Sequence, residues 1–233
     1  VLCLLLGKRV GYQKTPFRPH NLPFTVLGGA LLWFGWFGFN AGSALAANDL
    51  AANAFVTTHI ATAAAGLTWA LIEWQQHGKP TVLGTVTGAV AGLVAITPAC
   101  GFVNPMNAIF IGALASPLCY IAIAVVKARL GYDDALDAFG VHGVGGIWGT
   151  IATGFFAEKA VNAAGADGLL FGNPKQLLVQ LLSIIIVPLF AAAVTWVLFK
   201  VVDGAIGMRV EKREEIVGLD LTQQSESAYT VIE

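Results

Sequence analysis

The chain is short of charged residues. Only 12% of its 233 residues are Asp, Glu, Lys or Arg, whereas about 25% is usual in a soluble globular domain. The formal net charge is −1, and this near-balance gives no indication of a nucleic-acid partner. Cysteine is scarce too: Cys3, Cys100 and Cys119 have no zinc-site spacing, and they identify no redox compartment. Together these absences argue against a soluble protein and predict neither a metal nor a cofactor.

The sequence is instead rich in long apolar runs, and 56% of its residues are hydrophobic. A helix needs roughly 20 residues to cross the ~30 Å hydrocarbon core of a bilayer. Six stretches are long and apolar enough, which predicts an all-α, polytopic membrane helix bundle. The predicted spans are 24–47, 51–74, 81–101, 105–126, 138–157 and 176–200.

The remaining segments complete this plan. Residues 1–6, VLCLLL, are apolar but too short to cross, and they lack the charged start of a signal peptide. We interpret them as the end of a truncated span, and the chain as a fragment. Residues 7–23 are predicted to form a cytoplasmic loop and residues 201–233 a cytoplasmic tail.

Positive charges divide unevenly between the two sides that these spans define. Eleven Lys and Arg residues fall on one side, and only Lys159 and Lys175 fall on the other. Because cytoplasmic loops carry the excess of Lys and Arg, the first side is predicted to be cytoplasmic. The protein is therefore expected to cross the cell membrane several times, with its C-terminus inside the cell.

A histidine interrupts one of the predicted spans. His142 lies among glycines and apolar side chains in FGVHGVGGIWG, residues 139–149. Ionisable groups at membrane depth usually face a pore or the bundle interior, and a neutral imidazole offers one donor and one acceptor nitrogen. His142 is therefore a functional candidate. Burial for packing, with one ring nitrogen bonded to a carbonyl, is the alternative interpretation.

A second polar cluster lies in WFGFNAGSA, residues 36–44. A helical period of about 3.6 residues places Trp36, Phe39, Asn40 and Ser43 on one face. An aromatic ring with a hydroxyl one turn away is suited to a gate beside a weak cation site, since aromatic faces attract cations by ~0.5–2 kcal/mol. An ordinary packed stripe, with the serine bonded to its own helix, fits equally well.

Other ionisable residues near these clusters have simpler interpretations. Asp133, Asp134 and Asp137 precede His142 and are predicted chiefly to cap its helix, with substrate contact as the second interpretation. His59, among threonines and small residues, is interpreted as a structural or subunit-contact residue. A membrane enzyme or haem protein using His59 and His142 as ligands would require the two to face each other, and neither their spacing nor a nearby acidic or cysteine ligand supports it.

Four segments resemble the ammonium transporter family (Amt/Mep, related to Rh proteins). DDALDAFGVHGVGG is similar to the family's tenth-span motif, and PHNLPFTVLGGALLWFGWFGFNAGSA to its fifth-to-sixth-span segment. ITPACGFV and the tail element GLDLTQQSESAY match as well, so the resemblance covers essentially the whole chain. It implies the second half of an eleven-span inverted-repeat fold, from the end of the fifth span to the tail, assembled as a homotrimer.

The resemblance also implies roles for individual residues. His142 is similar to the second of two pore histidines, and its partner would lie just before Val1. Phe39 matches the inner of two stacked gate rings, Ser43 the hydroxyl of the outer ammonium site, and Trp36 the tryptophan below the gate. The remaining motif positions are Asp133, Asp137, Phe139 and Gly146.

The activity implied is uptake of ammonium, with methylammonium as its analogue, by a protein that is not an enzyme. Moving an intact ion into a low-dielectric lumen costs tens of kcal/mol by idealised Born estimates. Ammonium can instead lose its proton outside and cross as ammonia. Whether the proton crosses too is left open. A membrane-embedded ammonium sensor is the alternative, although it would normally carry a larger signalling domain than this tail.

The tail of the chain has an implied partner, a nitrogen-regulatory P-II protein. One departure from many bacterial relatives is Gln224-Ser225 before Glu226, where those proteins have His-Gly. A solvated charged linker is an equally good interpretation of EKREE, residues 211–215. The tail residues implied in regulation are Gly218, Leu219, Asp220, Glu226 and Tyr229.

Overall fold

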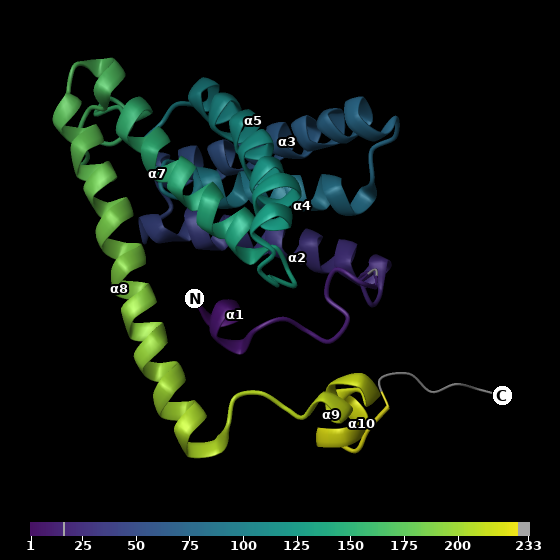
Figure 1. Ribbon diagram of the computed structural model, residues 1–233. Helices are drawn as coiled ribbons and strands as arrows, with labels where there is room; N and C mark the ends of the chain where they lie inside the picture. Colours follow the sequence, from purple (N-terminus) through teal and green to yellow (C-terminus); the bar gives the residue numbers. More distant parts are fainter. Residues whose placement is uncertain (16, 228–233) are drawn as a thin grey trace. The chain divides into compact units, whose positions relative to one another are not determined.

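The computed structural model describes residues 1–15 and 17–227, and within them every regular element is helical (Figure 1). The predicted all-α class is therefore confirmed. The chain separates into two compact units. The larger unit comprises residues 19–187, and the smaller unit combines residues 1–18 with the chain from residue 188 onward.

The larger unit is built from consecutive helices. Its first four are α2 (Leu22–Asn40), α3 (Asp49–His77), α4 (Val82–Ile96) and α5 (Pro105–Ile121). The chain then passes through the π-helical turn η2 (Ala122–Lys127), α6 (Ala128–Leu130), the π-helical turn η3 (Phe139–Gly143), α7 (Val144–Phe156) and the first half of α8 (Pro174–Ile206). Short 3-10 turns lie at Gly42–Ala44 and Leu169–Phe171.

Side-chain caps fix where helices α2 to α5 begin. In each case an Asn or Thr oxygen accepts a hydrogen bond from the backbone N–H three residues later. Such a cap stabilises a helix by about 1 kcal/mol, because it satisfies a donor that has no partner within the helix. The four capping residues are Asn21, Asn48, Thr81 and Asn104.

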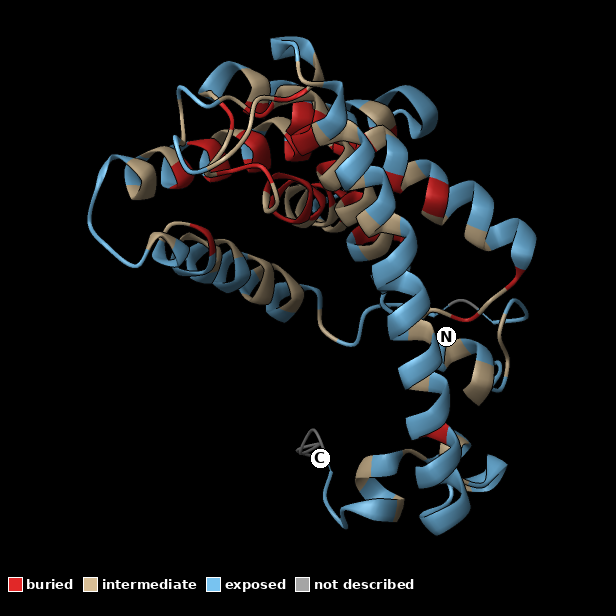
Figure 2. Ribbon diagram, turned by 90° about the vertical axis from the view of Figure 1, so that its left-hand side faces the viewer, coloured by how far each residue is buried: buried red, intermediate tan, exposed pale blue. Residues whose placement is uncertain are grey.

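The core of the larger unit lies where α3, α4 and α5 cross. A Cβ atom added at Gly92 or Gly112 would collide with the carbonyl oxygen of Ala61, so glycine at these positions permits direct backbone contact. Buried residues gather on these helices, as the red segments of Figure 2 show. α4 also contacts α2, η3 and α7, and it therefore connects the elements that carry the candidate site.

The lengths of the helices differ from those expected. Four helical stretches in the described part of the chain are long and apolar enough to cross a membrane: Leu22–Ala44, Asp49–His77, Pro105–Leu130 and Pro174–Ile206. α4 is apolar but shorter, and α2 ends at Asn40 before a 3-10 turn instead of continuing to residue 47. The six-span arrangement and its boundaries remain a prediction.

The smaller unit contains short helices and the second half of α8. Its short helices are α1 (Leu2–Leu6), α9 (Lys212–Val217) and α10 (Leu219–Gln223). Gly218 joins α9 to α10 with a φ of 113°, and a Cβ there would lie 2.6 Å from Oδ1 of Asp220. The positive φ favours glycine at this corner, because an L side chain would be strained there. Tyr229, one of the residues implied in regulation, lies outside the described residues.

Candidate functional site

His142 lies on η3, and its side chain is exposed in this chain. The preceding residue, Val141, is only 4% exposed and belongs to a buried cluster with Trp69, Ala91, Val94 and Cys119. His142 is therefore attached to a segment that is firmly packed, while the imidazole itself is not enclosed by the rest of the larger unit.

The contrast between a packed side, with Val141, and an exposed side, with His142, continues along α7, where its glycines show it. A Cβ at Gly145 would lie 3.3 Å from a methyl group of Val94, and one at Gly149 would collide with the carbonyl oxygen of Ala95. A Cβ at Gly146, in contrast, would meet nothing within 4 Å. Gly145 and Gly149 thus pack against α4, whereas Gly146, one turn beyond His142, lies on an open side.

Acidic residues hold the start of η3. Asp134 Oδ2 accepts a 2.7 Å hydrogen bond from the Phe139 N–H, so the capping role predicted for this acidic group belongs to Asp134. Asp137 has a φ of 54° and pairs with Lys127 Nζ at 2.6 Å. Lys127 also donates to the backbone oxygen of Asp134 at 2.6 Å. Asp133 is buried, with 7% of its surface exposed.

Lys127 was not among the residues that the sequence pointed to. Its position offered a signal, because it follows an apolar run and precedes a loop with three aspartates. Phe139 is half exposed, and its ring meets that of Tyr132 edge to face, with centroids 6.4 Å apart.

The residues of the WFGFNAGSA segment separate in the structure. Phe39 is 61% exposed, whereas Asn40 is 5% exposed and donates from Nδ2 to Thr58 Oγ1 at 2.9 Å. Ser43 Oγ, in the 3-10 turn after α2, donates to the carbonyl oxygen of Phe39 in the last turn of α2 at 2.6 Å. This local bond is close to the second interpretation of the serine, which had it bonded to its own helix. Asn40 is thus a packing residue, and Phe39 lies on the open side of α2.

Trp36 links this segment to the rest of the candidate site. Its ring meets Phe39 edge to face, with centroids 5.5 Å apart, and it packs against the buried cluster that contains Val141. Its indole Nε1 donates to Thr97 Oγ1 at 2.8 Å. Thr97, directly after α4, was not identified from the sequence, although it lies in the ITPACGFV segment.

His59 lies among aromatic rings on α2 and α3. Its ring centroid is 5.3 Å from that of Trp33 and 6.1 Å from that of Phe37, and Phe37 stacks on Phe55 at 4.0 Å. Within the described residues, no group of three His, Cys, Asp or Glu side chains is arranged to hold a metal ion. Both His59 and His142 are exposed in this chain, but only His59 has aromatic ring contacts among those described above.

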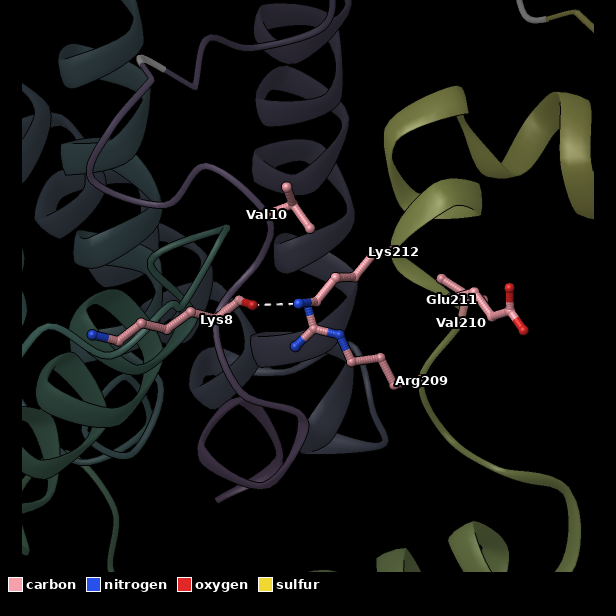
Figure 3. A pocket seen from close by; sticks show the side chains of 6 residues that line it. All are labelled: Lys8, Val10, Arg209, Val210, Glu211 and Lys212. Atoms are coloured by element: carbon pink, nitrogen blue, oxygen red, sulfur yellow. Dashed lines mark hydrogen bonds between the residues drawn. The ribbon is translucent and has the colours of Figure 1, made fainter.

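In the smaller unit, Arg209 connects the tail to the beginning of the chain. Its guanidinium donates to the carbonyl oxygens of Leu6 and Lys8, each at 2.7 Å, and pairs with Glu215 at 2.8 Å. Figure 3 shows the bond to Lys8. Glu215 also accepts from the Val10 N–H at 2.7 Å. This backbone bond, followed by the contact with Arg209, lowers the pKa of Glu215.

A pocket of about 660 Å³ lies beside this contact. Two of its lining side chains, Lys8 and Lys212, are exposed and basic, while Arg209 is already occupied by carbonyl oxygens and Glu215. The residues lining it are Lys8, Val10, Arg209, Val210, Glu211 and Lys212.

Comparison with known proteins gives consistent matches. Residues 1–229 match the sequence profile described as the Ammonium Transporter Family. An ammonium transporter of Bacillus subtilis is 51% identical over 98% of this chain and 56% of its own length. The ammonium transporter Amt1 of Archaeoglobus fulgidus is 50% identical over 98% of this chain and 58% of its own length. The chain thus spans little more than half the length of these curated relatives.

Solved structures agree with the sequence matches. Mep2 of Candida albicans superposes with a TM-score of 0.84 at 36% identity, covering 95% of this chain and 51% of that one. A structure described as a sensor Amt protein gives a TM-score of 0.84 at 30% identity, over 95% of this chain and 55% of that one. Because the family profile covers nearly the whole chain and the fold agrees, the chain belongs to the ammonium transporter family.

Proposed function

We propose that this chain forms part of a membrane protein that takes up ammonium and passes it inward as ammonia. One structural observation supports the assignment of the pore. The imidazole of His142 is exposed, whereas Val141, the residue directly before it, is buried in the core. Trp36 contacts both the exposed ring of Phe39 and the cluster that contains Val141. Phe39 and His142 would therefore belong to one wall of a common route.

The chemistry of the substrate supports this arrangement. An apolar passage excludes ammonium and potassium alike, because neither ion retains its hydration there. Ammonium differs from potassium in that it can lose a proton and continue as a small neutral molecule. A neutral imidazole at His142 would hydrogen-bond ammonia without adding a fixed charge. Phe39 would cover the site at which the proton is lost, with Ser43 on its outer side.

Several features of the whole protein belong to this proposal. They include a location in the cell (plasma or inner) membrane with the tail in the cytoplasm, a homotrimeric assembly, and binding of a P-II protein at the tail. The division of Lys and Arg between the two sides supports the orientation. Asp133, Asp137, Phe139 and Gly146 would support the pore from the same segment as His142.

A sensor of ammonium is the second candidate, because one similar structure is described as a sensor Amt protein. That protein is 30% identical to this chain, whereas the curated relatives described as ammonium transporters reach 50% and 51% identity. Transport is therefore the better supported function.

Uptake of radiolabelled methylammonium tests the proposal. The gene product that contains this chain should be expressed in cells that lack ammonium transporters of their own, and His142→Leu compared with the wild type. We expect the wild type to support uptake that excess ammonium inhibits, and His142→Leu to change its rate or its selectivity against potassium. His20→Leu, a control in the predicted loop, should leave both unchanged. Equal uptake and selectivity in wild type and His142→Leu would refute the role of His142.

A further inference from the structure

The hydroxyl group of Thr97 makes two hydrogen bonds that join different elements. Its Oγ1 donates to the carbonyl oxygen of Leu93 in the last turn of α4 at 2.7 Å, and accepts from Nε1 of Trp36 on α2 at 2.8 Å. A hydroxyl has a single hydrogen, so the bond to Leu93 directs the remaining lone pairs away from that carbonyl. The indole N–H of Trp36 occupies one of them.

The hydrogen bond to Thr97 fixes the orientation of the Trp36 ring. One part of the ring packs against the buried cluster that includes Val141, the neighbour of His142. The ring also meets Phe39 edge to face at 5.5 Å, with 65° between the two planes. Phe39 itself is 61% exposed, so few other contacts within this unit restrain its side chain.

We propose that Thr97 is a positioning residue for the transport site. Its hydroxyl orients the indole of Trp36, and the indole in turn sets the position of the Phe39 ring relative to the segment that carries His142. The inference rests on the proposed function, since it assigns Thr97 to the same site. Thr97 would influence how well the site selects ammonium without contacting it.

A purely structural role for Thr97 is the competing explanation. The bond from its hydroxyl to Leu93 satisfies a carbonyl oxygen near the end of α4, and this bond alone would account for the threonine. The two explanations differ in what Trp36 contributes. If Thr97 acts through the indole, replacing Trp36 by phenylalanine removes the N–H and makes the hydroxyl irrelevant to transport.

The test is a double-mutant cycle on methylammonium uptake by the gene product that contains this chain. We expect Thr97→Val and Trp36→Phe each to change kcat/KM by about two- to tenfold, the range that corresponds to one ordinary hydrogen bond. Thr97→Ser retains the hydroxyl and should behave as the wild type. The variant carrying both Thr97→Val and Trp36→Phe should be no worse than Trp36→Phe alone. Independent, multiplying effects would overturn the proposal, as would wild-type behaviour of Thr97→Val.

The hydrogen bond can be followed separately from transport. In protein labelled with ¹⁵N-tryptophan, the Trp36 indole resonance is identified by its loss in Trp36→Phe. It should shift in Thr97→Val and stay in place in Thr97→Ser. An unchanged resonance in Thr97→Val would show that the bond does not exist. Absence of uptake by the folded wild type would refute the proposed function, and with it the transport role of Thr97, even where the resonance shifts as expected.

Discussion

Gly146 and Gly149 lie on the same helix, yet their surroundings are opposite. Gly149 is pressed against the backbone of α4, where a Cβ would collide with Ala95, and a Cβ at Gly146 would have open space around it. The same contrast separates buried Val141 from exposed His142, and buried Asn40 from exposed Phe39. Residue type alone therefore does not reveal a residue's role, because a small residue can serve packing on one side of a helix and leave room on the other.

The largest effect is expected on the packed side. Gly149→Val would force the side chain into the Ala95 backbone, and we expect it to lower the free energy of unfolding by ~3 kcal/mol or more, the upper part of the range for overpacking. Gly146→Ala is the matched control and should change stability little. Unfolding of the purified protein in a denaturant titration measures both. An equal loss of unfolding free energy in the two variants would contradict the assignment of Gly149 to the packed side of α7 and Gly146 to its open side.

A smaller effect is expected at the end of α2. Asn40→Ala removes the buried bond to Thr58, and bonds of this kind in membrane helices contribute roughly 0.6 kcal/mol and at most about 1.7 kcal/mol. Ser43→Ala should cost less, because Ser43 is exposed and its bond is local, to Phe39 four residues earlier in the chain. The same denaturant titration compares them, and a larger loss for Ser43→Ala would contradict the assignment of Asn40 to the packed side.

The smallest effect is expected in the other unit, at the contact between Glu215 and Val10. The pKa of Glu215 is lowered in the folded chain, so the carboxylate stabilises the contact fully above the ordinary glutamate pKa of about 4.3. This contribution is lost as the pH falls through the lowered pKa. At pH 7, Glu215→Gln should therefore speed hydrogen exchange at the Val10 amide.

Glu226→Gln provides the control for this last experiment, because it removes the same charge from an exposed position in the tail. It should leave exchange at Val10 unchanged. For the wild type, exchange corrected for its intrinsic pH dependence should rise only in acid. A rise between pH 6 and pH 8 would assign the contact to a group other than Glu215.

The all-α class could be predicted from the sequence, whereas the ends of individual helices could be read only in part. The apolar runs predicted helices correctly, because backbone groups in an apolar environment must be satisfied within the helix. Regular helix α4 ends at Ile96, inside the predicted span 81–101, and Pro98 is the sequence signal for this helix end, because proline has no N–H for the next helical hydrogen bond. The end of α2 at Asn40 had a weaker signal, Gly42 directly after the C-cap Ala41, in a segment where small and apolar residues continue.

The candidate site was predictable only in part. His142 could be identified from its chemistry, because placing an ionisable side chain in lipid has a high free-energy cost. Such residues in membrane spans therefore usually line a pore or the bundle interior. Thr97 could not be found this way, because its importance arises from a hydrogen bond to a residue 61 positions away in the sequence. Threonines are common in helices of this kind, and only the folded chain distinguishes the one that contacts Trp36.

The π-helical turn at η3 has a consequence for how such a protein can change over evolution. A π-helical turn closes its hydrogen bonds over one more residue than an α-helical turn, and each residue of an α-helix advances the chain by about 100° around the axis. Within Phe139–Gly143 only Gly143 lies between His142 and α7. Deleting Gly143 would therefore turn the imidazole by roughly 100° relative to the glycines of α7. Deleting Gly140 would instead keep His142 in register with α7 and change its relation to the loop that precedes the turn.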